Sequence, residues 1–185
     1  MSDEDAVAFL RAMPVEEFMN DFVPAAKKRA PRQTINFDES SPDPYDVEFA
    51  LQANGLLPRL CPMAASNIAD SSNYPAVCVM PPPKHHEDPW EWGIVWRQVE
   101  LFMQVIPLEC DPFQDPNDSI TDRSAHVFEA PSIQARKARE QLEYYADCQN
   151  AHAFRTFTFS VTLMSTHARL FRWDQSGVIV TERFE

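Results

Sequence analysis

The segment from Arg155 to Met164 alternates apolar and polar residues, and it constrains the fold most strongly. A period of two predicts a β-strand that is buried on one face. Two further strand-like segments follow at 167–173 and 178–183. The turn Asp-Gln-Ser-Gly separates them, and its Gly177 can adopt a positive φ. The sequence therefore predicts a C-terminal three-strand meander. The alternating strand has one apolar and one polar set of side chains: Phe157, Phe159, Val161 and Leu163 against Thr156, Thr158, Ser160 and Thr162.

Upstream of this strand the pattern changes between helical and extended segments. Ser132 is a predicted N-cap for a helix over 133–150, which carries an apolar stripe at helical spacing. Apolar runs at 74–80 and 96–106 predict two more strands, each closed by proline. Residues 107–131 are expected to form an acidic, proline-punctuated loop. The fold class is thus α/β (α+β), with a mixed sheet of about five strands and flanking helices.

The N-terminal region differs from this pattern. Residues 1–42 are expected to form a helical, partly disordered arm, with one short helix over 3–13 and a second that Pro14 begins. A third helix is predicted between Pro42 and Pro58. Residues 43–185 are expected to form a single α/β domain.

Composition excludes several functions. The chain has 3 Gly, at Gly55, Gly93 and Gly177. Neither the dinucleotide motif G-x-G-x-x-G nor the P-loop can be written with those positions. The net charge of −12 opposes the phosphate backbone, so nucleic acid is not an expected partner.

The chain also shows no sign of secretion or of a membrane span. It opens with Met-Ser-Asp-Glu-Asp, which is not a signal peptide, and no apolar run is long enough to cross a bilayer. The expected location is intracellular, either cytoplasmic or nuclear. Reduced thiols are then expected at all four cysteines, which are Cys61, Cys78, Cys110 and Cys148.

One run resembles a metal site. His85, His86, Glu87 and Asp88 are consecutive. Adjacent residues on an extended chain point to opposite sides, whereas a metal needs three or four convergent ligands. A solvated loop is the better account. No catalytic, cofactor-binding or metal-binding residue is predicted.

The C-terminal block AHAFRTFTFSVTLMSTHARLFRWDQSGVIVTERFE resembles the fungal-type protein kinase family, a group of kinase-like proteins expanded in mushroom-forming (basidiomycete) fungi. Family members show an aromatic-rich strand of the type RTHxFSVxI and then ARxxRWDRSGxIVTExF. Gln175 replaces the usual Arg here. The resemblance covers roughly residues 74 to 185. The motif residues, with an expected structural or docking role, are Arg155, Arg169, Arg172, Trp173, Asp174, Ser176, Gly177 and Glu182.

In that family this segment precedes the catalytic lobes. Kinase chemistry needs a glycine-rich loop, a strand Lys, an HRD loop and a DFG Asp for magnesium. No HRD or DFG is present in this chain. The resemblance therefore implies a pseudoenzyme, a non-catalytic regulatory or protein-interaction module whose partner is another protein or its own kinase lobes.

Two alternatives stay open beside that reading. The catalytic lobes of a true protein kinase could lie beyond residue 185, since the chain stops directly after a predicted strand and looks truncated. ATP and magnesium are cofactors only in that case. The other alternative is an inactive relic of a metal-dependent nuclease.

The nuclease alternative rests on the order of elements. A helix, a strand with PD, a strand with ExK, a helix and a further strand is the order of PD-(D/E)xK nuclease-like domains. Their chemistry needs an Asp and a Glu to hold a divalent cation and a Lys to orient water. The matching positions here carry Ala76, Gln104 and Ile106, so all three chemical positions are vacant. The resemblance implies a degenerate core without metal chemistry.

The charged residues of the meander allow two interpretations. Arg169, Arg172 and Asp174 could form a docking patch for kinase lobes or a partner. Alternatively they form a cross-strand ion pair around the turn, with Trp173 covering the hairpin. For Asp174 we favour the second interpretation, because turn Asp residues commonly bond to their own backbone.

Overall fold

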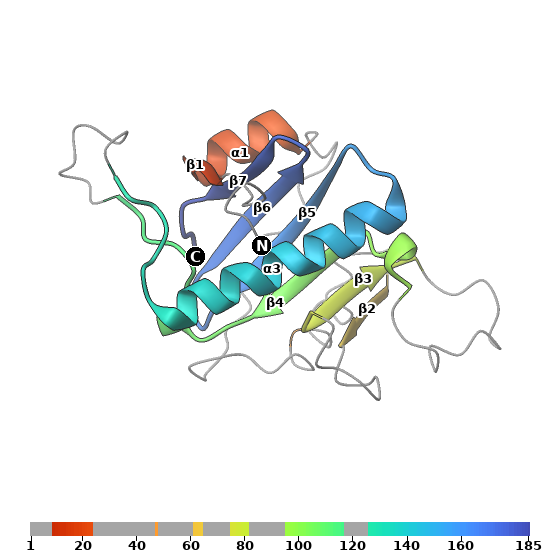
Figure 1. Cartoon of the computed structure of the whole chain (residues 1–185), viewed down its shortest axis with the longest axis horizontal. Coiled ribbons are helices and arrows are strands. Elements are labelled where there is room, and N and C mark those ends of the chain that lie inside the picture. The colour runs from red at the N-terminus through yellow and green to blue at the C-terminus, as the bar shows by residue number, and fades with distance from the viewer. Residues whose placement is uncertain (1–8, 24–46, 48–60, 65–74, 82–94, 117–125) are drawn as a thin grey trace, which may run out of the picture.

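A seven-stranded mixed β-sheet is the centre of the fold (Figure 1). The computed structural model describes residues 9–23, 47, 61–64, 75–81, 95–116 and 126–185. Within them the strands are ordered β1-β7-β6-β5-β4-β3-β2, with β1/β7 and β4/β5 parallel and the other pairs antiparallel. The strands are β1 (Phe9–Met13), β2 (Cys61–Ala64), β3 (Val77–Met80), β4 (Leu101–Val105), β5 (Phe157–Leu163), β6 (Ala168–Asp174) and β7 (Gly177–Thr181).

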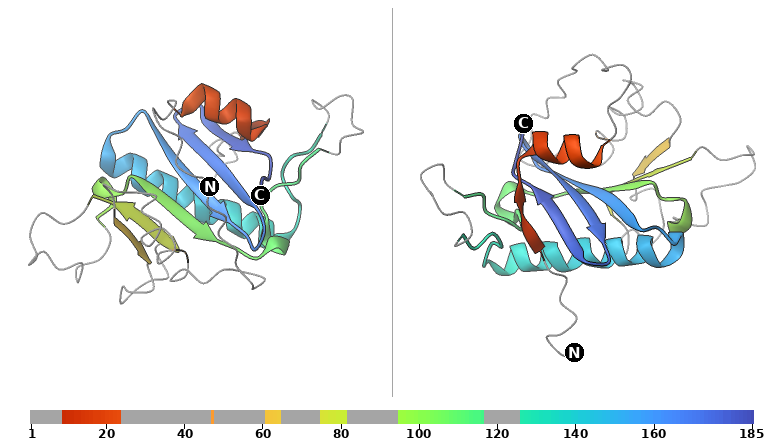
Figure 2. Two further views of the ribbon diagram at one scale, coloured as in Figure 1. Left: turned by 180° about the vertical axis from the view of Figure 1, so that it is seen from behind. Right: turned by 90° about the horizontal axis from the view of Figure 1, so that it is seen from above.

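Two α-helices cover opposite faces of this sheet. Helix α3 (Ile133–Ala153) runs along one face, and the shorter α1 (Val15–Phe22) lies on the other (Figure 2). Helix α3 begins where the sequence predicted, because Ser132 Oγ accepts a hydrogen bond of 3.0 Å from Ala135 N–H. It ends at Phe154, which takes a left-handed φ of 49°. The predicted mixed α+β character is confirmed, with more strands than the expected five.

Aromatic side chains fill the space between α3 and the sheet. Tyr145 of α3 meets the Phe102 ring of β4 edge to face, with centroids 5.8 Å apart. On β6, Phe171 and Trp173 stack with their ring centroids 5.6 Å apart. A smaller apolar cluster occupies the opposite face of the sheet. It contains Val47, Val77, Val79 and Met103.

Strand β5 forms as predicted, but both of its faces are covered. The most deeply buried side chains are the polar ones, since Thr158, Ser160 and Thr162 are at most 2% exposed. They lie under α3, and the apolar set is only partly buried or, at Phe157, exposed. Ser160 Oγ accepts a 2.8 Å hydrogen bond from Trp173 Nε1. The hydroxyls of Thr158 and Thr162 have no hydrogen-bond partner among the described residues.

The helix predicted over residues 3–13 is wrong for its described part. Residues 9–13 form strand β1 instead of a helix, and β1 pairs in parallel with β7. The second predicted helix is present as α1, and its Phe18 is 1% exposed. The unpaired edge of β7 explains the difference, because its backbone groups need partners and a neighbouring strand supplies them.

Three other predicted segments change in detail. The strand predicted over 96–106 begins as a 3-10 turn, Trp96–Gln98, before β4. The described parts of the acidic segment, 107–116 and 126–131, are more ordered than the predicted loop, with a 3-10 turn at Leu108–Cys110 and a bridge between Phe113 and Glu129. The helix predicted between Pro42 and Pro58 lies outside the described residues except for Val47, which is helical. None of the described helices is long and apolar enough to cross a membrane.

The unpartnered hydroxyls lead to a stability prediction. Thr162→Val removes a buried hydroxyl without a partner, so the free energy of unfolding should rise by about 1 kcal/mol. Ser160→Ala is the matched control. It removes a bonded hydroxyl and leaves Trp173 Nε1–H unsatisfied, so the free energy should fall by about 1 kcal/mol. Urea denaturation followed by tryptophan fluorescence measures both values, and a fall for both variants would contradict the prediction.

Candidate functional site

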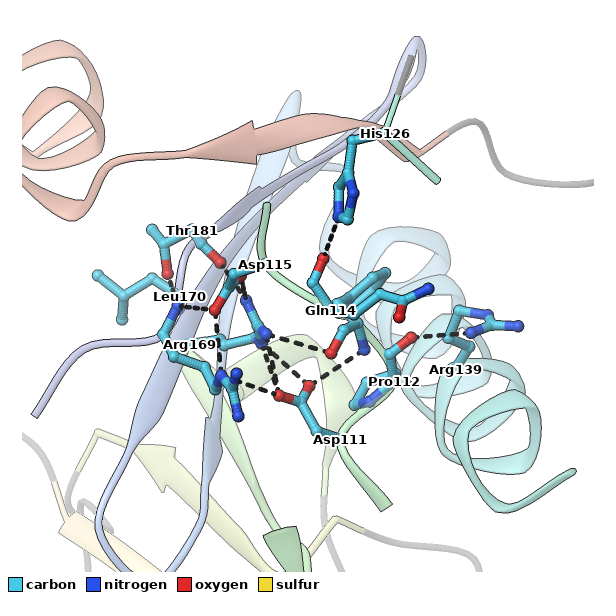
Figure 3. Close-up of polar contacts among 11 residues, drawn as sticks. Asp111, Pro112, Gln114, Asp115, His126, Arg139, Arg169, Leu170 and Thr181 are labelled. Carbon is cyan, nitrogen blue, oxygen red and sulfur yellow. Dashed lines mark hydrogen bonds and ion pairs between the residues drawn. The ribbon is translucent and has the colours of Figure 1, made fainter. Parts of the chain in front are cut away.

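A fully buried arginine lies at the base of the acidic segment (Figure 3). Arg169 of β6 faces α3 and is 0% exposed. Its Nε donates to both carboxylate oxygens of Asp111, and Nη2 donates to Asp111 Oδ2 at 2.9 Å. Its Nη1 donates to Asp115 Oδ1 at 2.7 Å and to the Thr181 carbonyl at 2.9 Å. With Nη2 also 3.3 Å from the Phe113 carbonyl, the guanidinium has no donor left for a ligand.

The second carboxylate of this cluster, that of Asp115, connects the acidic segment to the residues that follow β7. Asp115 Oδ2 accepts hydrogen bonds from the Arg183 backbone N–H at 3.1 Å and from Arg183 Nε at 3.0 Å. Burial by itself would raise the pKa of Asp115. The hydrogen bond and charge of Arg169, together with the bonds from Arg183, outweigh burial and lower that pKa below its usual value. Asp115 is therefore an ionised anchor between the acidic segment and the end of β7.

A second arginine holds the same segment from the helix side. Arg139 of α3 donates from Nη1 to the carbonyls of Pro112 and Ala130, at 2.8 and 2.9 Å. Its Nε pairs with Glu129 at 3.3 Å. These contacts hold together the two chain segments joined by the Phe113–Glu129 bridge. The acidic segment thus has a rigid base, built from two arginines that belong to different layers of the fold.

The three vacant nuclease-like positions lie at the carboxyl end of β4. Ala76 N–H donates to Gln104 Oε1 at 3.1 Å, so these two positions are in direct contact. Gln104 Nε2 lies 3.5 Å from Gln141 Oε1 of α3, and Gln141 Nε2 donates to the Tyr145 hydroxyl at 2.8 Å. Ile106 is buried, and its backbone N–H donates to the Leu163 carbonyl. The amide of Gln104 therefore joins β3 to α3.

The polar residues facing α3 form a row across the strands. Register pairs Gln104 with Thr162 on β5, and Thr162 with Arg169 on β6. The row lies where the parallel strands β4 and β5 end, a common place for ligand sites in open α/β sheets. Here its amide and guanidinium groups are bound to other parts of the chain, so the row stabilises the layer beneath α3.

The hairpin of β6 and β7 places the remaining motif residues. Asp174 Oδ1 accepts a hydrogen bond from Ser176 N–H at 2.9 Å and another from the Ser176 hydroxyl. The Ser176 hydroxyl bond and the Arg172 ion pair lower the pKa of Asp174. Gly177 has a φ of 136°, a value that favours glycine. The favoured turn interpretation of Asp174 agrees with this geometry.

The Arg172 ion pair differs from the expected cross-strand arrangement. Arg172 and its partner Asp174 lie two residues apart on one strand, and therefore on the same face. The guanidinium also lies over the rings of Phe22 and Phe157, 4.8 and 5.0 Å from their centroids. Arg172 thus connects α1 to the sheet, and Trp173 faces the opposite side, under α3.

Arg155 and Glu182 lie apart from this hairpin turn. Arg155 pairs with Glu100 at 3.0 Å, which joins the start of β5 to the start of β4. Glu182 N–H donates to the Met13 carbonyl at 2.8 Å and so extends the β1/β7 pairing. The motif residues are therefore spread over both faces and several elements, and they do not form one docking patch.

Sequence reasoning missed Asp111 and Asp115 as the partners of Arg169. The expected ion pair lay around the hairpin turn, whereas the aspartates come from a segment more than 50 residues upstream. A signal was present: Arg169 shares the inward face of β6 with Phe171 and Trp173. A charge at an inward position requires a buried counter-charge, and the acidic segment supplies it.

The described residues include a buried thiol, Cys78, in the core. Burial raises the pKa of the Cys78 thiol, which stays protonated and is a poor nucleophile. Among the described His, Cys, Asp and Glu side chains, no group of three could hold a metal ion. The run His85 to Asp88 lies outside the described residues.

Comparison with known proteins returns no relative. No family model matches the chain, and no curated protein or solved structure matches it. The functional argument therefore rests on the geometry of the side chains.

The buried arginine gives a direct mutational prediction. Arg169→Met leaves the Asp111 and Asp115 carboxylates without their main counter-charge, and the free energy of unfolding should fall by about 3–5 kcal/mol. Arg183→Met is the matched control. Arg183 contacts the same aspartates but is 37% exposed, so its loss should lower the free energy by less than about 1 kcal/mol. Urea denaturation measures both, and equal effects would show that burial of Arg169 is not what matters.

The lowered pKa of Asp115 predicts a pH dependence. Its folded-state pKa lies below the unfolded value of about 3.9, so ionised Asp115 stabilises the fold above that pH. This contribution disappears as the pH falls through the folded-state pKa. The difference in unfolding free energy between the wild type and Asp115→Asn should therefore shrink as the pH falls from about 5 to about 2. A difference that stays constant over this range, measured by urea titration, would rule out the assignment.

Proposed function

We propose that this chain is a non-catalytic regulatory or protein-interaction module of the fungal-type protein kinase family. The support is the role of its C-terminal motif. Arg169 anchors the acidic segment, Asp174 and Ser176 form the turn, and Trp173 donates to Ser160 beneath α3. In this proposal the motif specifies a scaffold, which a family can keep without any phosphoryl transfer.

The amide of Gln104 is the observation that carries the proposal. Its oxygen accepts from Ala76 N–H, and its nitrogen faces Gln141 of α3. The oxygen and the nitrogen are thus both engaged within the domain. A neutral amide between two strands and a helix is a structural link, and it supplies neither a metal ligand nor a general base.

The same contact supports a degenerate PD-(D/E)xK core. The elements β3, β4, α3 and β5 follow in the order of that scaffold. The two positions that carry the cation ligands in the nuclease pattern are in contact here, since Ala76 N–H donates to Gln104 Oε1 at 3.1 Å. The antiparallel neighbours β5, β6 and β7 support the C-terminal meander beyond it. We therefore propose that an ancestral nuclease-like core was retained as a scaffold after its chemistry was lost.

The expected partner is a protein, either another chain or the kinase lobes that follow this region in the family. The net charge of −12 disfavours nucleic acid and favours a basic partner surface. Cytoplasm or nucleus is the proposed location. If catalytic lobes follow residue 185 in the whole protein, ATP and magnesium belong to those lobes, and this region would regulate them.

Two measurements test the proposal. The melting temperature of the chain should not change with Mg-ATP, whereas binding at a hundredfold excess over Kd would stabilise the fold by about 2.7 kcal/mol. Titration of the separately expressed catalytic lobes of a fungal-type kinase should give a saturable complex and a changed rate of substrate phosphorylation. An unrelated protein of similar net charge is the control for non-specific binding.

The outcomes separate the candidate functions. A melting temperature that rises with Mg-ATP, or phosphorylation by the chain alone, overturns the non-catalytic proposal. Magnesium-dependent cleavage of DNA by the chain overturns the proposal that its nuclease-like core has no metal chemistry. If the catalytic lobes neither bind the chain nor change their rate of substrate phosphorylation in its presence, the kinase-regulatory role is overturned.

A further inference from the structure

The N-terminal unit formed by β1 and α1 is attached at the edge of the sheet. The β1/β7 pairing is irregular, since its register shifts between Phe9 and Ala12. It is also an edge pairing, because β1 is the last strand of the sheet on that side. Edge strands with interrupted ladders open at a lower free energy than central strands.

Helix α1 adds a small anchor to this strand. It has eight residues, and Phe18 is the buried one, at 1% exposed. Its N-cap is Pro14, which supplies no side-chain hydrogen bond, and no basic residue lies in its last turn. An isolated helix of this length is unstable in water, so α1 depends on the surface beneath it.

That surface combines an apolar part with a positive charge. The Phe18 ring meets Phe159 edge to face at 6.1 Å, and Arg172 lies 4.8 Å above the Phe22 ring. Helix α1 carries Glu16 and Glu17 in its first turn. The surface therefore fits a short strand followed by a helix with two phenylalanines four residues apart.

We propose that two copies of this chain exchange their β1–α1 units, so that each unit docks on the partner's β7 and Phe159 surface. The contacts are the same within one chain and between two, which makes exchange a low-cost route to a dimer. Residues 24–46 connect the unit to Val47, and 23 residues can span up to about 80 Å. Exchange also keeps the β7 edge paired, whereas simple release would expose it. The inference is independent of the proposed kinase-family function.

Cross-linking of full-length chains tests the exchange. Met13 and Thr181 are paired in the β1/β7 register, and paired Cα atoms lie within the range of a disulfide. A Met13→Cys chain is mixed with a Thr181→Cys chain at high concentration and then oxidised. We expect a disulfide-linked dimer whose linked peptides contain positions 13 and 181. The matched control replaces Thr181→Cys by Ile133→Cys on the exposed face of α3, and it should give no more dimer than the wild type.

A peptide-binding measurement tests the same surface without introducing cysteines at buried positions. A fluorescent peptide of residues 7–24 is titrated with full-length chains carrying Phe18→Ala or Met19→Ala. Phe18→Ala weakens the unit in its own chain, and Met19→Ala, at an exposed position, does not. Release of an intramolecular competitor should make the peptide bind the Phe18→Ala chain at least about tenfold more tightly. If Phe18→Ala does not fold, Phe18→Leu replaces it, with the same order of affinities expected.

These outcomes decide the proposal. Equal dimer yields for the Thr181→Cys and Ile133→Cys mixtures overturn it, because the cross-link would then report random collision. Equal peptide affinities for the Phe18 and Met19 variants overturn it too, because the surface would then not accept the unit from outside. Binding of catalytic kinase lobes affects neither result, so failure of the proposed function is distinguishable.

Discussion

The buried ion pair of Arg169 with Asp111 and Asp115 is the interaction on which the rest of the structure depends. A fully buried guanidinium is expensive to desolvate, and it is stable here because five N–H groups meet two carboxylates and two carbonyls. These contacts join β6, the end of β7 and the acidic segment. Arg139 then joins that segment to α3. The described parts of the acidic segment, 107–116 and 126–131, are thereby attached to the sheet and to α3.

The layer between α3 and the sheet shows a related constraint. Its floor on β5 consists of Thr and Ser, so helix and sheet are joined through polar groups as well as aromatic rings. Gln149 donates to the Val99 carbonyl, and Gln104 faces Gln141, at two levels along the helix. Directional bonds of this kind fix the position of a helix more narrowly than apolar contacts do. The cost is visible in the unpartnered hydroxyls of Thr158 and Thr162.

Local signals predicted the elements whose sequence decides their structure. Ser132 and the stripe after it gave α3, and the alternation from Arg155 gave β5. The helix prediction for the N-terminal segment failed at residues 9–13. There, pairing with the edge of β7 outweighs the local helix propensity, and the residues form a strand. Side-chain alternation predicted which residues share each face of β5, but not which elements pack against each face. Those depend on α3 and α1, which pack from distant parts of the chain.

At the candidate site, the sequence did not predict the bonds that the side chains form. Sequence comparison with the nuclease-like pattern placed Ala76 and Gln104 at equivalent positions, and the two residues are in contact. It could not predict that the Gln104 amide would bond to the Ala76 backbone N–H and to Gln141 of α3. A metal-binding Asp and Glu hold their strands together through the cation they share. In this chain the Gln104 amide joins β3, β4 and α3 directly. Its partners Ala76 and Gln141 lie far from Gln104 in the sequence, so no local pattern could have predicted this link.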